Sequence, residues 1–257
     1  MFLGAIAFAG VIAALIAYGR WWNLHGGGKF LREKNERRKA DREASVKARG
    51  WNYDGTIDGN IHYRISGVAS VGTPWLIQYD SDQSSSSSTP RLSFIVAALA
   101  APEYRWIIHD KPTYDVVQKR MIKAVIGGIV SLVGAFSDAM KIKRDFFERG
   151  RDLRAGSAEF RGRYVLASTD SRWAALLDSE IERGILAWPP FKQTMSRRDN
   201  CVSAELTPQG LCVHVYCDAP EMAVIEHMAK LGQRLTEKCL QIDAPASPPR
   251  ESSNPGG

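Results

Sequence analysis

A continuous apolar run at residues 2–18, FLGAIAFAGVIAALIAY, constrains this chain more than any other feature. The run has no charged side chain, and Arg20, Trp21 and Trp22 follow it closely. A helix rises about 1.5 Å per residue, so the run with its flanks just crosses a hydrocarbon core about 30 Å thick. Tryptophan favours the membrane interface. We therefore predict an uncleaved transmembrane anchor over residues 1–22, with residues 2–22 in contact with the lipid bilayer.

Three other interpretations of this run fit less well. A secretory signal peptide has a basic segment before its apolar run and small residues at its cleavage site, whereas Trp21 and Trp22 stand at that place here. A helix buried in a soluble domain is rarely apolar on every face at a chain terminus. A lipoprotein signal needs a cysteine after the run, and the first cysteine of this sequence is Cys201.

A basic segment follows the anchor, after a flexible break predicted at residues 26–28. Residues 29–49 hold nine Lys or Arg and four Asp or Glu. Positive flanks remain in the cytoplasm, so we predict an N-terminus outside and a domain on the cytoplasmic face of a bacterial inner membrane. The segment is polar on every side, which predicts a solvated helical stalk over residues 23–49. Its cations also favour contact with anionic lipids through Lys29–Arg49.

The composition of the 257 residues, 44% hydrophobic and 24% charged, is typical of a globular protein. The stalk supplies five of the six net positive charges, so the rest of the chain is close to neutral and no nucleic-acid partner is predicted.

Proline and serine in residues 242–257 predict a disordered tail. This leaves one soluble domain over residues 50–241, with a sub-boundary near 140–158. Its four cysteines are expected to be free thiols in a reducing cytoplasm.

The first half of this domain has the alternation of strands. Apolar and polar residues alternate in segments 61–65, 74–79 and 104–109. Segment 91–99 also has strand character, and the connections between the four segments are short. Short connections favour an antiparallel meander of these four strands. The serine-rich stretch between Asp80 and Pro90 is expected to be an exposed loop.

The second half predicts further strands and two helices. Residues 160–168 have strand character, and Asp170 is placed to cap a helix that continues to Ile185. Residues 200–206 and 211–217 predict a hairpin about the turn 207–210. Asp218 and Glu221 mark the start of a last helix, whose buried face holds four apolar residues: Val224, Met228, Leu231 and Leu235.

Between the two halves, Ala124–Ser137 is an uncharged run of fourteen residues. A run of that length is more often buried or interfacial than spanning. We predict that it packs against the domain or lies on the membrane surface, and the sequence leaves open whether it touches the membrane.

Few residues suggest chemistry. In the predicted hairpin register, Leu206 faces Leu211 on an apolar face, while Glu205, Cys212 and His214 share the other face. These three are zinc-ligand types, but a fourth ligand is missing and a flat sheet does not wrap a tetrahedral ion. His109 and Asp110 form a second candidate, a general base oriented by a carboxylate, although nothing places a nucleophile nearby. We therefore predict no catalytic residue, no metal site and no cofactor.

Residues 51–240, most strongly those after 158, are similar to a family of uncharacterised bacterial proteins. The likeness rests on weakly specific structural positions: Phe160, Arg163, Tyr164, Leu166, Asp170, Leu176, Leu177, Trp188, Pro189, Gly210, Leu211, Val213 and Val215. The resemblance implies a single-pass membrane protein with a cytosolic domain of unknown function. It supplies no activity and no catalytic residue.

These patterns together predict an α+β fold: an N-terminal transmembrane helix, then a cytosolic domain of antiparallel strands with helices packed on one side. The favoured function is a membrane-tethered, non-enzymatic binding or scaffold protein with a protein partner that the sequence does not identify. The alternative is a membrane-associated enzyme or lipid-handling domain with a pocket near Trp106 and His109. A deep cavity lined by Trp75, Trp106 or His109 would favour the alternative, and a filled core would favour the binding protein.

Overall fold

The computed structural model describes residues 27–55, 61–82, 89–116, 118, 145–189 and 202–244. The predicted anchor, the Ala124–Ser137 run and nearly all of the tail lie outside these residues. The chain divides into two compact units, residues 1–53 and 54–257. Among the described residues, no helix combines the length and the apolar character needed to cross a membrane.

In the first unit, residues 27–47 form the helix α2 (Gly27–Lys47). A helix is confirmed over this range, whereas its role as a stalk stays a prediction. The predicted break at residues 26–28 is wrong in part, because α2 begins at Gly27. The side chains of residues 36–41 are exposed, and Lys47 Nζ lies 2.7 Å from Glu43 Oε1 one turn away. Such an exposed pair contributes little to the stability of the helix, because water screens the two charges.

The chain has an α+β domain built on a nine-stranded sheet, whose first strand spans the sequence boundary between the two units. The strands follow the order β1-β2-β3-β4-β9-β8-β5-β7-β6, and every ladder from β2 to β6 is antiparallel. In chain order they are β1 (Asn52–Asp54), β2 (Ile61–Val68), β3 (Pro74–Asp82), β4 (Thr89–Val96), β5 (Trp106–Asp110), β6 (Arg151–Asp152), β7 (Tyr164–Ser168), β8 (Val202–Thr207) and β9 (Gly210–Tyr216).

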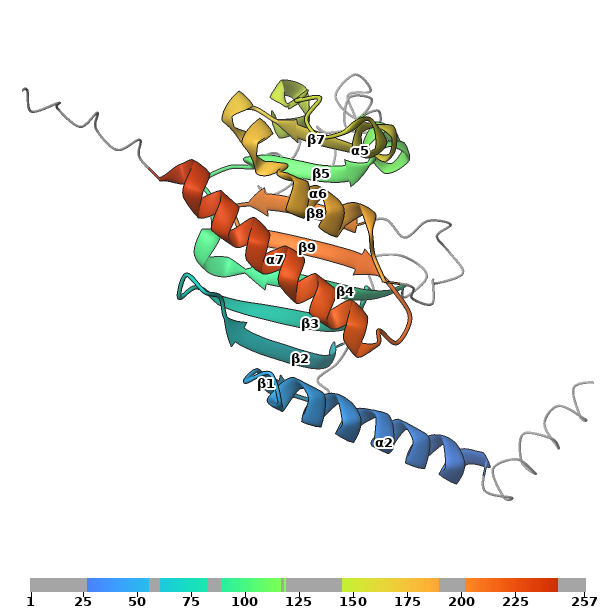
Figure 1. The fold of residues 1–257 in the computed structure, drawn as a ribbon. Helices are drawn as coiled ribbons and strands as arrows, with labels where there is room; N and C mark the ends of the chain where they lie inside the picture. Colours follow the sequence, from blue (N-terminus) through green and yellow to red (C-terminus); the bar gives the residue numbers. More distant parts are fainter. Residues whose placement is uncertain are drawn as a thin grey trace, which may run out of the picture. The chain divides into compact units, whose positions relative to one another are not determined.

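The predicted meander is confirmed for β2, β3 and β4 and wrong for β5. The hairpin β8–β9 lies between β4 and β5, so β4 pairs with β9 and β5 pairs with β8 (Figure 1). After β4 the chain passes through the short 3-10 helix η1 (Ala97–Leu99) before β5 begins. Two strands from the later part of the chain, β8 and β9, therefore separate β4 from β5 in the sheet.

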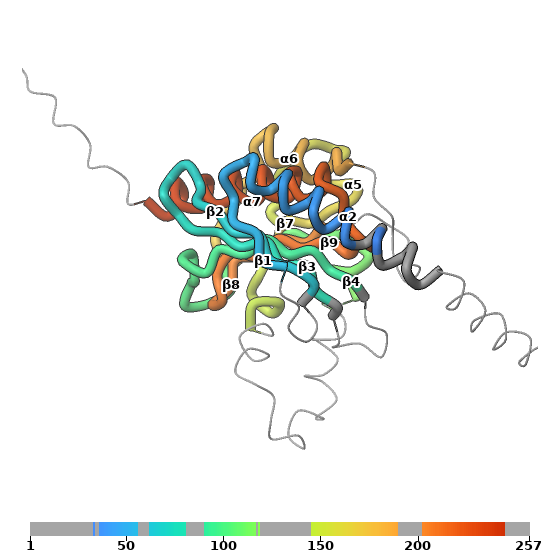
Figure 2. The backbone as a smooth tube through the Cα atoms, turned by 90° about the horizontal axis from the view of Figure 1, so that it is seen from below, coloured from blue at the N-terminus to red at the C-terminus, as the bar shows by residue number. Residues whose placement is uncertain are grey.

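The long helix α7 (Met222–Asp243) crosses one face of the sheet (Figure 1). Its predicted buried stripe is confirmed, since Val224, Met228, Leu231 and Leu235 are at most 4% exposed. The helix begins at the predicted place, but its N-cap is Glu221 and no side chain caps it. Figure 2 shows α6 (Ser179–Leu186) on the same side of the strands as α7.

The predicted strand 160–168 and the predicted helix from Asp170 to Ile185 are both wrong in part. In each, a capping side chain starts a helix that was not predicted. Ser157 Oγ accepts a hydrogen bond from the Phe160 amide, so residues 158–163 form α5 (Ala158–Arg163) before β7. Asp170 caps as predicted, but its helix is the short 3-10 helix η3 (Ser171–Leu176). Asp178 then accepts from the amides of Glu180 and Ile181 and starts α6 as a separate helix.

The opposite face of the sheet also carries helical residues, so the prediction of helices on one side is incomplete. The helical segments 111–116 and 145–149 bring aromatic side chains onto β5 and β7. The buried cluster there consists of Tyr104, Ile107, Tyr114, Phe146, Phe147, Val165 and Ala167. The domain thus has a core on each face of β5 and β7.

Candidate functional site

The hairpin β8–β9 has the predicted register. Leu206 pairs with Leu211, Ala204 with Val213 and Val202 with Val215, all at most 1% exposed. Alternation along a strand then places Glu205, Cys212 and His214 on the face away from α7, as predicted. The side chains of this face are the polar and titratable types that a reaction or a metal would need.

The polar face continues beyond the hairpin as a row of paired residues across six strands. His214 pairs with Ser203 on one side and with Ser93 on the other, and Ser93 pairs with Gln78. The row is continued by Arg64 on β2 and by His109 on β5. Its members are Arg64, Gln78, Ser93, His214, Ser203 and His109. Sequence reasoning identified only the part of the row that lies in the hairpin and at His109.

Hydrogen bonds connect neighbours in this row. Ser203 Oγ lies 2.9 Å from His109 Nδ1 and joins β8 to β5. At the other end, Arg64 Nε donates to Gln78 Oε1 over 3.3 Å, and Gln78 Nε2 donates to Asp80 Oδ2 over 2.8 Å. Asp80 is 6% exposed and forms an ion pair with Arg91 at 3.3 Å. These contacts give polar partners to the buried Asp80 carboxylate and to the buried Ser203 hydroxyl, as buried polar groups require.

The possible metal ligands do not converge. Glu205 pairs with Cys212, while His214 pairs with Ser203 one position further along the face. Burial, followed by the nearby Glu205 carboxylate, raises the pKa of Cys212 to about 12, so its thiol stays protonated at neutral pH. A cysteine binds a metal ion as the thiolate and not as the protonated thiol, so this environment disfavours Cys212 as a ligand. Among the residues that the structure describes, no three His, Cys, Asp or Glu side chains are grouped to hold a metal ion.

His109 and Asp110 each have a different polar partner. Asp110 Oδ1 accepts the Thr113 amide over 3.0 Å and so caps the helical segment 111–116, while His109 is bonded to Ser203. Ser203 is 6% exposed and contacts His109 through Nδ1, whereas a serine nucleophile in a catalytic triad is bonded to Nε2. The pair therefore resembles a structural cross-link between strands.

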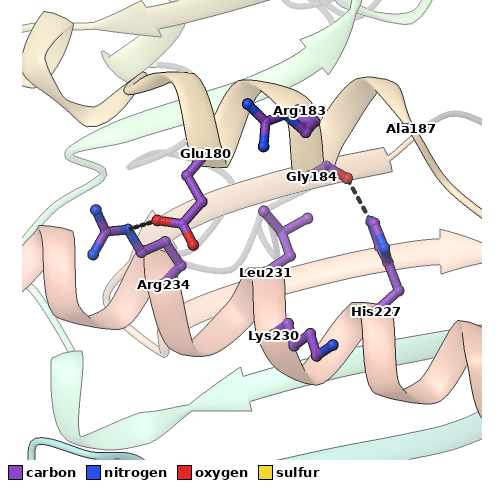
Figure 3. Close-up of a pocket in the computed structure, with 8 residues that line it drawn as sticks. All are labelled: Glu180, Arg183, Gly184, Ala187, His227, Lys230, Leu231 and Arg234. Atoms are coloured by element: carbon purple, nitrogen blue, oxygen red, sulfur yellow. Dashed lines mark hydrogen bonds and ion pairs between the residues drawn. The ribbon is translucent and has the colours of Figure 1, made fainter.

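A pocket that sequence reasoning did not identify lies between α6 and α7. Its volume is about 260 Å³ (Figure 3). Gly184 on α6 allows this close packing, because a Cβ there would meet Leu231 Cδ1 at 3.0 Å. The lining residues are Glu180, Arg183, Gly184, Ala187, His227, Lys230, Leu231 and Arg234.

One end of this pocket is an ion-pair network centred on Arg234. Its guanidinium lies 3.0 Å from Asp178, 3.1 Å from Glu180 and 3.4 Å from Glu237. Burial acts to raise the pKa of Asp178, but the Ile181 amide and the cations Arg234 and Lys238 outweigh it, so this pKa is lowered. The network joins the start of α6 to the middle of α7.

The other end of the pocket is formed by His227. Its Nε2 lies 2.6 Å from the Gly184 carbonyl oxygen, and its ring centroid lies 4.6 Å from that of Trp188. The ring therefore closes the space between the end of α6 and the first half of α7. A glycine inside an amphipathic helix, as at Gly184, is the one sequence signal that could have indicated this close approach.

Comparisons with known proteins add little to this geometry. No protein-family model matches the chain, and neither does any curated protein. The chain is similar to a solved structure, the crystal structure of the mycobacterial trehalose monomycolate transport factor A, TtfA, with a TM-score of 0.40 and 10% sequence identity. The alignment covers 82% of this chain and 97% of that chain. A likeness at this level carries no conclusion about function, and the resemblance to a family of bacterial membrane proteins has no support from a family model.

Proposed function

We propose that this chain is a membrane-tethered, non-enzymatic binding or scaffold protein on the cytoplasmic face of a bacterial inner membrane. In this proposal residues 2–22 contact the bilayer, Lys29–Arg49 contacts anionic lipids, and the α+β domain binds a protein partner. The observation that carries the binding function is the packing around Trp75 and Trp106. An enzyme or lipid-handling domain would need a cavity at these residues, but side chains fill the space there.

Both tryptophans are packed against other aromatic rings on the α7 face of the sheet. Trp106 is fully buried with its centroid 6.2 Å from that of Trp173, and Trp75 is 3% exposed with its centroid 5.7 Å from that of Phe94. These distances are those of aromatic pairs in contact. The side chains occupy the space in which a substrate would have to bind.

The alternative pocket near Trp106 and His109 also conflicts with the geometry of β5. Trp106 and His109 are three residues apart in one strand, so their side chains point to opposite faces of the sheet. Trp106 contacts Trp173, whereas His109 contacts Ser203. In the part of the chain that the structure describes, the two side chains therefore line opposite faces of the sheet, and this supports the binding function over a lipid-handling domain with that pocket.

The proposed tether predicts that deleting residues 1–26 moves the protein from the membrane fraction to the soluble fraction. The deletion removes the apolar run and keeps α2 and the domain. Fractionation of cells that express the full or the shortened chain measures this. If the shortened chain still pellets with membranes after a high-salt wash, residues 1–26 are not the only anchor, and the single-span proposal is wrong.

The proposed orientation predicts that a reporter fused after Gly257 stays inactive if it works only outside the cytoplasm. The expectation rests on the nine cations of residues 29–49, which hold that flank inside. A second fusion, with a reporter that is active only in the cytoplasm, is the control for expression and should be active. Activity of the first reporter would reverse the topology.

A further inference from the structure

One row of cross-strand neighbours on the face away from α7 is buried at one end and partly exposed at the other. The row consists of the paired residues Ala167, Ile107, Glu205, Cys212, Ile95 and Leu76. The first two are fully buried in the aromatic cluster that segments 111–116 and 145–149 form on β5 and β7, whereas the last two are partly exposed. An apolar surface on β4 and β3 therefore continues beyond the part of this face that the described segments cover.

The direction of the row follows from the residues next to it. Phe94 faces α7, since a Cβ at Gly232 would meet its ring at 2.3 Å. Phe94 pairs with Ile77 on one side and with Val213 on the other, so all three face α7. Successive side chains of a strand point to opposite faces, which places the neighbouring Leu76, Ile95 and Cys212 on the other face.

The two segments of the aromatic cluster are also the two ends of one excursion of the chain. The ring centroids of Tyr114 in the first and Phe147 in the second lie 5.7 Å apart, so the chain leaves and returns at neighbouring places. Residues 119–144, which lie outside the described residues, connect them, and Ala124–Ser137 is the uncharged part of this stretch. Packing an apolar run on an apolar surface removes both from water and is favourable.

We propose that Ala124–Ser137 lies along this row as a helix and packs on Cys212, Ile95 and Leu76. Fourteen helical residues measure about 21 Å, and the four strand spacings from β5 to β3 measure about 19 Å. The seven residues 138–144 extend to about 23 Å, enough for the chain to return to Asp145. The run is therefore long enough to reach the end of the row, and the remaining chain is long enough to come back.

The competing position for this run is the bilayer. The sheet is favoured because Tyr114, Phe146 and Phe147, which stand on either side of the excursion, are buried in the cluster on β5 and β7. Both ends of the excursion are therefore held at the sheet. The inference does not rest on the proposed tether, because the row belongs to the domain. It adds that a protein partner binds elsewhere than on this face of β3, β4 and β9.

The first test is disulfide cross-linking of the full chain in cell membranes. A cysteine is placed in the middle of the run at three successive positions, one at a time, which sample different sides of a helix. The variants are Val130→Cys, Ser131→Cys and Leu132→Cys. The matched control is Ser179→Cys, an exposed position on α6, on the α7 side of the sheet (Figure 2). After oxidation with copper phenanthroline, mass spectrometry of the peptides identifies each link.

We expect at least one of the three cysteines to link to Cys212 of the same chain about tenfold more than the control does, because a disulfide needs Cα atoms within about 7 Å. The inference is overturned if none of them exceeds the control or if the links join two chains. It is also overturned if a photoreactive lipid labels the run and no link to Cys212 forms, since the run then lies in the bilayer.

The second test compares Ile95→Asp with Val68→Asp in the full chain, purified in an uncharged detergent. A run that covers Ile95 would bury the new carboxylate, so this variant should melt at least about 5 °C below the unchanged protein. Val68 is 65% exposed, and its variant should melt within about 2 °C of the unchanged protein. If Ile95→Asp melts as the Val68→Asp control does, the row is open and the inference is wrong. Detergent replaces the bilayer here, so this outcome is independent of the tether.

Discussion

Replacing Val213 with aspartate is expected to unfold the domain. Val213 is fully buried in the middle of β9, paired with Phe94 on one side and Ala204 on the other. All three side chains face α7, so a carboxylate there would lose its hydration without gaining a partner. The cost is several kcal/mol, comparable with the whole stability of a domain, about 5–15 kcal/mol. Circular dichroism of the purified chain in mild detergent measures the loss of the folded state.

A matched control is Val71→Asp in the turn between β2 and β3. Val71 is 47% exposed, so the same chemical change should alter the free energy of unfolding by no more than about 0.5 kcal/mol. If Val213→Asp melted like the unchanged protein, Val213 would have to point away from α7. The hairpin register would then be shifted by one residue, which exchanges the two faces of the strand.

The hairpin was predictable because its register depends on neighbouring residues alone. A turn at residues 207–210 fixes which positions face one another, and the alternation of apolar residues fixes which face is buried. The same holds for α7, whose apolar spacing determines its buried stripe without reference to the rest of the fold. Both predictions are confirmed.

The order of the strands could not be predicted in this way. Strand β4 pairs with β9, more than a hundred residues later in the chain, and no local pattern encodes that choice. The short connection from β4 to β5 favoured direct pairing of these two strands. In the sheet, however, β9 pairs with β4 and β8 pairs with β5, so the hairpin separates β4 from β5. Local capping was missed for a different reason. The helix that Ser157 starts runs into the predicted strand 160–168, and Asp178 starts a new helix inside the predicted helix 170–185.

The pocket was not predictable because its residues come from two helices far apart in the sequence. Arg183 and Lys230 are separated in the chain by β8 and β9 and line the same pocket only because α6 packs on α7. The candidates that the sequence did suggest lie on the strands, where their spacing is readable. There the structure shows strand-to-strand contacts, such as that of His109 with Ser203, in place of a convergent site.

A second large effect is expected for Gly232→Ala on the buried side of α7. A Cβ at this position would lie 2.3 Å from Phe94 Cδ1 and 2.5 Å from two other ring atoms. The ring cannot move away freely, because Phe94 is fully buried and stacked on Trp75. Alanine favours a helix over glycine by about 1 kcal/mol, but overpacking of a core costs about 1–3 kcal/mol or more. At such a close approach we expect a net loss of about 2 kcal/mol, which lowers the melting temperature by roughly 4–8 °C.

Gly162→Ala on α5 separates the clash from the helix propensity. A Cβ at Gly162 meets nothing within 4 Å, so this variant should melt at the same temperature as the unchanged protein or above it. Combining Gly232→Ala with Phe94→Leu removes the ring that the new methyl group meets. The double variant should therefore lose less stability than the two single variants lose in sum, since residues in contact are coupled. Additive losses, or a Gly232→Ala protein as stable as Gly162→Ala, would mean that α7 does not pack on Phe94 through Gly232.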